Sequence, residues 1–405
     1  MHASFNSPAR SLRLARRAAT GSAKCSLRLV SSHNATSKGP APTQTQTSAY
    51  SRQSPTSVSS TFTTTLITDA STGPFPSATS KAATVTPSST SSATPSSTFP
   101  ASIFSLKQVY NGSSFFNGWD FFSGSDPTQG TVTYLDSATA WSSGLVSINS
   151  AGNAVMRIDT TPVVSGTRNS IRIQTQVTFN GGLLVLDAVH MPHGCGTWPA
   201  FWTNGPTWPV TGEIDIVEGV DDSVQNLISL HTNPGCTVPP NSGSTSTSAN
   251  GLDCSAADSS NTGCGQRSTL ANDYGSAFNS AGGGVYAMLW DNSGIQVFFF
   301  TRDNIPADLV RDAPLPNTWG LPAARFPSST CNPYQFFQDH SAIFDTTLCG
   351  SWAGTQGSWQ TTNYAGQSAS CQQITGANTC TQYVLNNGAA FADAYWEVVS
   401  VKLFQ

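Results

Sequence analysis

Glutamate is scarce in this sequence. Only Glu213, Glu218 and Glu397 occur among 405 residues, although Asp and Glu together number 22. Long apolar runs are missing as well: no stretch of 18 or more apolar residues exists, so no transmembrane segment is expected. Nor does any segment convincingly repeat apolar residues at i, i+3, i+4 and i+7, the period of an amphipathic helix. The missing helical periodicity predicts a chain composed mainly of strands. The placement of two of the three glutamates close together indicates that they have a functional role.

Basic residues are scarce in most of the chain. Residues 1–100 hold nine Lys and Arg and a single acid, Asp69, which leaves nine basic and 21 acidic residues for 101–405. All ten Trp also lie after residue 100. An acidic, Trp-rich segment with a formal charge of −12 does not resemble a basic nucleic-acid-binding face, so no nucleic-acid partner is expected.

The first hundred residues divide into two segments of unusual composition. Residues 1–38 are basic and free of acids, and they contain no apolar run of signal-peptide length; such a composition is typical of organelle transit peptides. Residues 39–103 form a linker rich in Ser, Thr and Pro, which we expect to be disordered because it has too little apolar surface to offset the entropy of ordering. This linker is either an O-glycosylated stalk or a plain flexible connection. Residues 104–405 are the expected folded domain.

The nine cysteines favour an oxidising compartment. Without Cys25, eight remain in the folded domain, an even number that shows neither a CxxC pair nor clustered His residues. This pattern disfavours a zinc site and favours disulfides and export. Sequons at Asn34 and Asn111 agree with it. We therefore expect an extracellular or cell-wall-associated protein, even though no signal peptide is recognisable.

Alternation of polar and apolar residues predicts many strands. The segment SIRIQTQVTF places Ile171, Ile173 and Val177 on one face, and FNGG after it is a hairpin-like signal. DNSG at 291–294 is another tight-turn signal. Similar strand patterns occur in GGLLVLDAVHM, GEIDIVEGV, NLISLHT, GVYAMLW, GIQVFFFT and YWEVVSVKLF. They predict an all-β antiparallel sandwich or barrel in one domain, with residues 232–266 as a long loop fixed by cysteines.

The two neighbouring glutamates lie in TGEIDIVEGV, residues 211–220. In a regular strand Glu213 and Asp215 share one face, while Ile214 anchors the strand in the core from the other face. Glu218 lies five positions from Glu213 and would point away. One β-bulge around residues 216–217 returns Glu218 to the face of the other two acids.

Three carboxylates on one face repel one another, so at least one pKa should be raised. Acids with separated pKa values suit general acid/base chemistry, and two glutamates that lean together match the ~5–5.5 Å spacing of a retaining glycosidase. The alternatives are a calcium site or a solvated strand face. A straight strand wraps an ion poorly, and a solvated face does not account for the local enrichment of glutamate.

Tryptophans crowd the segment just before the acids. GTWPAFWTNGPTWPVTG supplies Trp198, Trp202 and Trp208, and aromatic rings of this kind stack on the apolar face of a pyranose. Any single Trp is more often a core residue than a binding surface, but three within eleven residues beside an acidic strand favour sugar stacking. His231, in SLHTN on the next expected strand, either hydrogen-bonds a sugar or an acid or is a core histidine.

The motifs HMPHGCGTWPAFW and WPVTGEIDIVEGV resemble glycoside hydrolase family 16, and most closely its fungal laminarinase-like endo-β-1,3(4)-glucanases. GTRNSIRIQT, LHTNPGC, CGSWAG and the final FADAYWEVVSVKLFQ extend the resemblance over residues 104–405. The E-x-D-x-x-E spacing resembles the laminarinase-like branch, whereas lichenases and wall transglycosylases have E-x-D-x-E. The resemblance implies a concanavalin-like β-jelly-roll of two curved antiparallel sheets, with a glucan-binding cleft on the concave sheet.

The resemblance also implies roles for single residues. Glu213 matches the nucleophile, Glu218 the general acid/base, and Asp215 an acid that assists the nucleophile. No cofactor and no metal ion are implied. Asp345 and His340 stand where the family tends to have apolar or amide residues. Substrate binding is implied for Trp202, Trp208 and His231, and on weaker matches for Arg172, Asn169 and Trp352.

We therefore expect a retaining endo-glycosidase that hydrolyses β-1,3- or mixed β-1,3/1,4-glucan through a covalent glycosyl-enzyme intermediate, acting as a monomer. One alternative is a cell-wall glucan transglycosylase, which shares the covalent step. Another is a non-catalytic glucan-binding, lectin-like domain, which the presence of all three acids disfavours.

Overall fold

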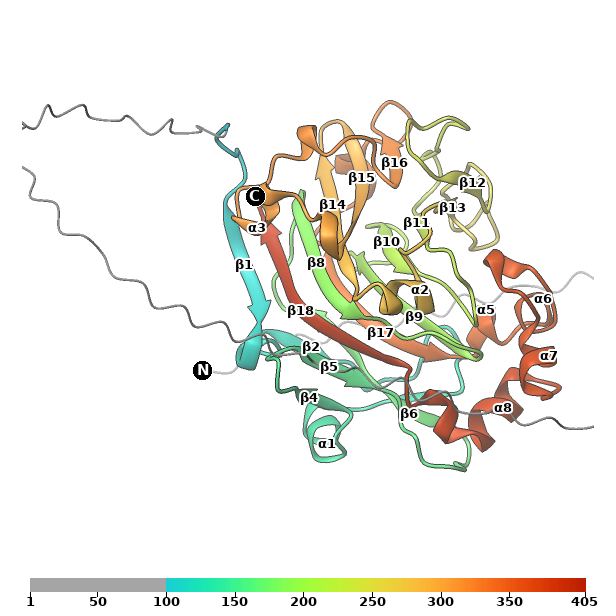
Figure 1. The fold of residues 1–405 in the computed structure, drawn as a ribbon. Coiled ribbons are helices and arrows are strands. Elements are labelled where there is room, and N and C mark those ends of the chain that lie inside the picture. The colour runs from blue at the N-terminus through green and yellow to red at the C-terminus, as the bar shows by residue number, and fades with distance from the viewer. Residues whose placement is uncertain (1–99) are drawn as a thin grey trace, which may run out of the picture. The chain divides into compact units, whose positions relative to one another are not determined.

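The computed structural model describes residues 100–405, where two eight-stranded antiparallel sheets pack on each other (Figure 1). Sheet A has the order β16-β15-β14-β8-β18-β5-β4, and β1 pairs with β18. Sheet B has the order β12-β13-β11-β10-β9-β17-β7-β2. The basic segment 1–38 and nearly all of the linker 39–103 lie outside the described residues, so their expected properties stay predictions.

The chain passes several times from one sheet to the other. Sheet A consists of β1 (Leu106–Asn111), β4 (Val146–Ile148), β5 (Ala154–Arg157), β8 (Gly182–His190), β14 (Gly284–Asp291), β15 (Gly294–Thr301), β16 (Ala324–Pro327) and β18 (Tyr395–Phe404). Sheet B consists of β2 (Trp119–Phe121), β7 (Arg172–Thr175), β9 (Thr197–Asn204), β10 (Glu213–Glu218), β11 (Leu227–His231), β12 (Thr247–Ala249), β13 (Cys264–Arg267) and β17 (Ser341–Leu348). A short parallel pair is formed by β3 (Val132–Tyr134) and β6 (Arg168–Ser170).

Side-chain alternation builds the core between the sheets. Apolar residues of sheet B such as Ile173 and Ile214 are fully buried against residues of sheet A such as Leu186 and Val398. Each such side chain contributes about 1.5–3 kcal/mol by leaving water. The intervening residues of sheet B point the other way, and that outward face carries the acids.

The turn signals give one correct and one wrong prediction. DNSG closes the β14–β15 hairpin, where Asp291 pairs with Gly294. FNGG does not close a hairpin, because β7 belongs to sheet B and β8 to sheet A. A β-carbon on Gly182 would lie 2.3 Å from the carbonyl oxygen of Phe404, so glycine there permits a close approach of two strands. Since β7 ends at Thr175, Val177 is 42% exposed and does not join the core as expected.

Short helices were not expected from the sequence. The four that occur from residue 350 onward, α5 to α8, gather at one end of the fold (Figure 1). The α-helices are α1 (Ser137–Ser142), α2 (Gly275–Ser280), α3 (Ala307–Val310), α4 (Pro333–Phe336), α5 (Gly350–Ala353), α6 (Gln356–Trp359), α7 (Cys371–Thr375) and α8 (Cys380–Asn386). Single 3-10 turns are η1 (Gly112–Ser114), η2 (Arg302–Asn304), η3 (Pro316–Thr318), η4 (Tyr364–Gly366) and η5 (Gly388–Phe391). Within residues 100–405 no helix is long and apolar enough to cross a membrane.

The eight cysteines of the described residues form four disulfides, as their even number predicts. The pairs are Cys195–Cys371, Cys236–Cys331, Cys254–Cys264 and Cys349–Cys380. The segment 232–266 is fixed by two of them as expected, but it also contains β12 and the start of β13, so it is not a plain loop. The other two disulfides attach α7 and α8 to the body of the fold.

Candidate active site

Strand β10 carries the three acids on one face. Glu213 pairs with Asn204 of β9 and Asp215 pairs with Trp202. The register then shifts between Asp215 and Val217, so that Glu218 comes opposite Ala200. This is the β-bulge that the odd spacing predicts, and it puts all three acids on the outward face of sheet B.

Each glutamate accepts a hydrogen bond from a different indole. Trp208 donates its Nε1 hydrogen to Oε2 of Glu213. Trp198 donates its Nε1 hydrogen to Oε1 of Glu218 at 2.9 Å. Trp208 remains 45% exposed, so one side of this ring is open to a ligand. The structure therefore brings both tryptophans to the acids, but as carboxylate partners as well as candidate stacking surfaces.

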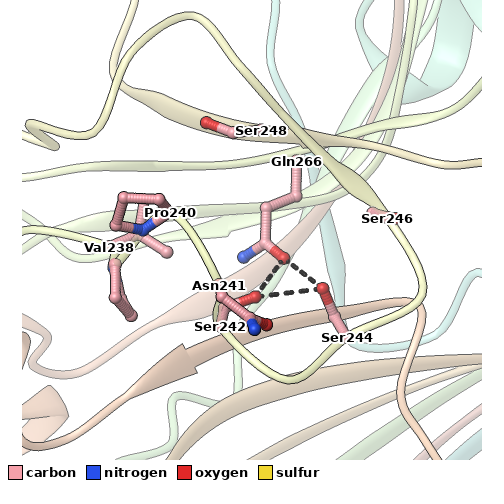
Figure 2. A pocket seen from close by; sticks show the side chains of 9 residues that line it. Val238, Pro240, Asn241, Ser242, Ser244, Ser246, Ser248 and Gln266 are labelled. Carbon is pink, nitrogen blue, oxygen red and sulfur yellow. Dashed lines mark hydrogen bonds between the residues drawn. The ribbon is translucent and has the colours of Figure 1, made fainter.

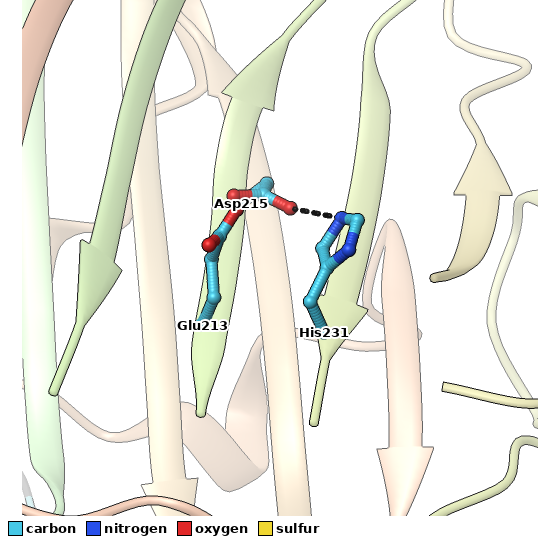
Figure 3. Close-up of side chains that lie close together, drawn as sticks. All are labelled: Glu213, Asp215 and His231. Atoms are coloured by element: carbon cyan, nitrogen blue, oxygen red, sulfur yellow. Dashed lines mark ion pairs between the residues drawn. The ribbon is translucent and has the colours of Figure 1, made fainter. Parts of the chain in front are cut away.

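His231 lies on β11 directly opposite Glu213. Its Nε2 is 3.4 Å from Oδ2 of Asp215 (Figure 3). One polar atom from each of Glu213, Asp215 and His231 lies within 4.8 Å of the others, which is close enough for three metal ligands. A metal would require His231 to be neutral.

The electrostatics oppose that requirement. Burial raises the pKa of Glu213 to about 8, and the neighbouring Asp215 adds to the shift. Burial likewise raises the pKa of Glu218 well above its ordinary value. Burial alone would lower the pKa of His231, but Glu213 and Asp215 outweigh it and raise that pKa to about 9. The charged form of His231 is thus favoured at neutral pH, and it offsets the negative charge of the neighbouring acids.

A second polar cluster lies two strands away, on β7 and β17. Asp345 pairs with Arg172 across these strands, and Nη1 of Arg172 is 3.6 Å from Oδ2 of Asp345. Trp202 donates its Nε1 hydrogen to the same oxygen at 3.3 Å, and the guanidinium lies 5.0 Å from the centroid of its ring. Burial raises the pKa of Asp345 to about 7, although Arg172 opposes the shift. Asp345, Arg172 and Trp202 thus form one unit on the face that carries the acids.

The remaining candidates differ in their relation to the acids. Trp352 lies edge-on to Trp198, with ring centroids 5.4 Å apart, so it belongs to the Glu218 end of the site. Asn169 lies on β6, outside both main sheets, and within residues 100–405 no hydrogen bond or ion pair joins it to the acids. His340 is fully buried between Thr203 and the backbone of Thr211, so it is a core residue.

A polar pocket of about 400 Å³ opens beside the Glu213 end of the site. Its position follows from the strand register, because Asn204 in its wall is the cross-strand neighbour of Glu213. The pocket is lined by Asp120, Gln174, Thr175, Gln176, Thr178, Asn204, Gly205, Pro206, Asp339 and Ser341. This volume and these hydroxyl, amide and carboxylate groups suit a hydroxyl-rich ligand.

Comparison with known proteins gives this site its family. Residues 119–404 match the model described as "XgeA-like, catalytic GH16 domain". The chain belongs to glycoside hydrolase family 16. It is 40% identical over 309 residues to a probable glycosidase of Schizosaccharomyces pombe, covering 76% of this chain and 70% of the relative. It is 38% identical to an endo-1,3(4)-β-glucanase of Arthroderma benhamiae, covering 74% of this chain and 64% of that protein.

Two solved structures of family 16 share both fold and sequence with the chain. One is laminarinase 16A from Phanerochaete chrysosporium, with 6-O-glucosyl-laminaritriose in its donor and acceptor sites. It is 36% identical, with a TM-score of 0.68, over 75% of this chain and 99% of that one. The other is an elongating β-1,3-glucosyltransferase, 35% identical with a TM-score of 0.67, over 75% of this chain and 100% of that one. The expected concanavalin-like β-jelly-roll is thereby confirmed.

The chain spans only part of several relatives. A probable endo-1,3(4)-β-glucanase of Neosartorya fischeri is 39% identical over 306 residues, yet these cover 75% of this chain and 46% of that protein. The chain thus spans about half the length of that relative.

One residue beside the family 16 acids has no signal in the sequence. Asn226 precedes β11 in DDSVQNLISLHT, where nothing distinguishes it from the other polar residues of a loop. In the structure it is fully buried and its side chain bonds to the backbone of β10 on both sides of Val217. The contact of Asn226 with β10 can be recognised only from the three-dimensional position of the bulge.

Proposed function

We propose that this family 16 domain is a retaining endo-β-1,3(4)-glucanase. The observation that carries the proposal is the bulged strand β10, on which Glu213 and Glu218 face the same way and each accepts a hydrogen bond from its own indole. The names of the fungal relatives and the laminarin oligosaccharides of laminarinase 16A support β-glucan as the substrate. They also support an enzyme over a lectin-like domain.

In the first step Glu213 attacks the anomeric carbon while Glu218 gives its proton to the leaving glycosidic oxygen. The bond from the anomeric carbon to that oxygen breaks, and a covalent glycosyl ester forms on Glu213. Burial favours the protonated form of Glu218 that this step requires. In the second step Glu218 removes a proton from water, which attacks the same carbon and releases Glu213.

Asp215 and His231 maintain the nucleophile. Burial and the charge of Asp215 raise the pKa of Glu213, whereas the cationic His231 and the indole of Trp208 oppose that shift and favour the ionised form that attack requires. The strand pairing holds His231 directly opposite Glu213. Asp215 lies between this pair and the bulge, and its 3.4 Å contact with His231 fixes the imidazole. The positive charge develops on the sugar ring in the transition state, where these carboxylates stabilise it.

The cleft on either side of the acids supplies binding surfaces for the glucan. Trp198 and Trp352 lie beside Glu218, and Trp208 lies beside Glu213. Trp202, held by Arg172 and Asp345, lies between them in the next strand. The pocket beside Asn204 extends the polar surface past Glu213, which suits an enzyme that binds several sugars of one chain.

The substitution Glu213→Gln tests the proposal. Removal of the nucleophile should reduce laminarin hydrolysis by at least about 10³-fold, because no glycosyl ester can form, while thermal unfolding shows a folded protein. Wild-type assays on laminarin, lichenan and β-1,4-glucan, with identification of the products, define the linkage. Near-wild-type turnover by the Glu213→Gln variant would refute the assignment.

Transglycosylation is a second candidate, because a structure of similar fold and 35% identity is an elongating β-1,3-glucosyltransferase. The covalent step is shared, and the outcome depends on whether water or a second glucan reaches the glycosyl ester. Incubation with a labelled laminarin oligosaccharide distinguishes the two. Labelled products longer than the acceptor would favour transfer, and shorter ones alone would favour hydrolysis.

We further propose that residues 104–405 act as a monomer outside the cell or in its wall. The four disulfides and the fungal glucanase relatives support this location. Detection of the active enzyme in the culture fluid or wall fraction, at the mass of one chain, would agree with it.

A further inference from the structure

Asn226 contacts the catalytic strand without reaching the cleft. Its side chain is fully buried, and its Oδ1 accepts a hydrogen bond from the backbone N–H of Glu218 at 2.8 Å. Its Nδ2 donates to the backbone oxygen of Ile216 at 2.9 Å. The two bonds therefore lie on either side of Val217, where the bulge occurs. The backbone oxygen of Asn226 in turn accepts a hydrogen bond from the N–H of Ser268 at 2.9 Å, which holds the backbone of Asn226 in place.

The strand pairing explains why the bulge needs this support. On one side β10 pairs with β9 as far as Glu218, but on the other side its pairing with β11 stops at Asp215. The backbone N–H and C=O groups beyond Asp215 thus have no strand to bond on that side. A buried backbone group without a partner is costly, and an amide side chain can supply both a donor and an acceptor. Asn226 takes the place of the missing strand.

We propose that Asn226 is a positioning residue which sets the catalytic position of Glu218 by holding the bulge. The inference rests on the proposed glucanase function. Glu213 precedes the bulge and is held by both neighbouring strands, through its pairing with Asn204 and His231. Its position therefore does not depend on the side chain of Asn226. Loss of Asn226 therefore affects proton transfer by Glu218 and spares nucleophilic attack by Glu213.

This separation has a kinetic signature in the dependence on the leaving group. A glucan oxygen leaves poorly unless it is protonated, whereas the dinitrophenolate of 2,4-dinitrophenyl β-laminaribioside leaves without a proton. The experiment uses the full chain with Asn226→Asp, which loses the donor to Ile216, and Asn226→Leu, which loses both bonds. We expect kcat/KM for laminarin to fall about 100-fold, within the range that general acid/base catalysis contributes. The burst of dinitrophenolate should keep a rate within about 3-fold of wild type.

The second half-reaction gives an independent readout. Release of the glycosyl ester by water needs Glu218 as a base, so steady-state turnover of the dinitrophenyl substrate should also fall. Azide attacks without a base, so it should restore that turnover and yield the glycosyl azide. A purely structural role for Asn226 would not produce rescue by azide.

Gln266 provides a matched control, because its buried amide also bonds to backbone away from the acids. Its Nε2 donates to the oxygen of Arg325 at 2.7 Å, and its Oε1 accepts from Ser242 and Ser244 in a small pocket of about 30 Å³ (Figure 2). Gln266→Leu should lower the melting temperature and leave the ratio of the two substrates unchanged.

The outcomes separate the two proposals. If wild type cleaves neither substrate, the proposed function fails, and this inference fails with it. If wild type cleaves both, the positioning role is overturned by Asn226 variants that keep laminarin activity, or that lose the burst and laminarin activity equally. Failure of both variants to fold would overturn it too, since the amide would then be a requirement for folding. Selective loss of laminarin turnover with azide rescue supports it.

Discussion

At the scale of single residues, the site depends on the hydrogen bonds and ion contacts that individual side chains make with the three acids. The sequence places Trp198, Trp208 and His231 near the acids but does not indicate that each makes its own contact with one carboxyl group. Those contacts depend on the register of β9, β10 and β11, which pattern reasoning cannot supply. The role of Asn226 was missed for the same reason. Asn169 lies on β6, outside both main sheets, and its part in substrate binding stays a prediction.

Asp345 gives a residue-scale prediction in which pH decides the result. Burial raises its pKa from 3.8 to about 7, so the folded protein binds this proton more tightly than the unfolded chain, and stability is lost as pH rises from about 4 to 7. Asp345→Asn removes that loss. The melting temperature of the variant relative to wild type should therefore rise between pH 4 and pH 8.

The same substitution should affect substrate binding only above pH 7. Below that pH the wild-type carboxyl is itself neutral, so Asn is a close mimic and KM for laminarin should match wild type. Above it the variant lacks the charge that holds Arg172 beside Trp202, and KM should rise a few-fold. An equal change in KM at pH 5.5 and pH 8 would contradict this account.

At the scale of elements, the sheets were predictable and the helices were not. Two-residue alternation identifies the long strands because each exposes a different face to core and solvent. The α-helices after residue 350 have at most seven residues, too few for a periodic apolar stripe. They depend instead on end contacts, such as the capping box of Ser370 and Gln373 on α7 and the cap of Thr379 on α8. The capping residues Ser370 and Thr379 can be seen in the sequence, but the same residue types also occur in ordinary turns, so they do not identify a helix by themselves.

The cap on α7 leads to an element-scale prediction. Ser370→Ala removes a buried hydroxyl that accepts from the N–H of Gln373, which should cost about 1 kcal/mol of unfolding free energy. In a domain of this size that corresponds to a fall of about 2–4 °C in melting temperature. Laminarin turnover should be unchanged, because α7 bears none of the acids. Ser123→Ala, at an exposed serine outside any sequon, is the control, and an equal fall in both variants would argue against the cap.

At the scale of the whole molecule, disulfides join regions that the sheets do not. Cys195–Cys371 links the segment before β9 to α7 across 176 residues of sequence, whereas Cys254–Cys264 closes a loop with a sequence separation of 10 residues. The even number of cysteines was enough to predict that they pair. The pairing itself was beyond sequence reasoning, because eight cysteines allow 105 arrangements and only the fold selects one.

The two loops should differ in their effect on stability. In the chain-entropy model, loss of Cys195–Cys371 by double Ser substitution costs about 5 kcal/mol, and loss of Cys254–Cys264 about 3 kcal/mol. Thermal unfolding of both double variants under non-reducing conditions tests the order. If the short loop proved the more stabilising, native-state contacts around it, and not chain entropy, would determine the effect.

The pairing of β1 with β18 has a further consequence for connectivity. Ser105 and Gln405 exchange two backbone hydrogen bonds, of 2.8 and 3.0 Å. The start of β1 therefore lies beside the end of β18. A short peptide could join them, and the chain could then be opened elsewhere, for example between Asn292 and Ser293 in the β14–β15 turn. Such a circular permutant should fold and keep the cleft intact, because the acids depend on which strands lie next to one another and not on where the polypeptide starts.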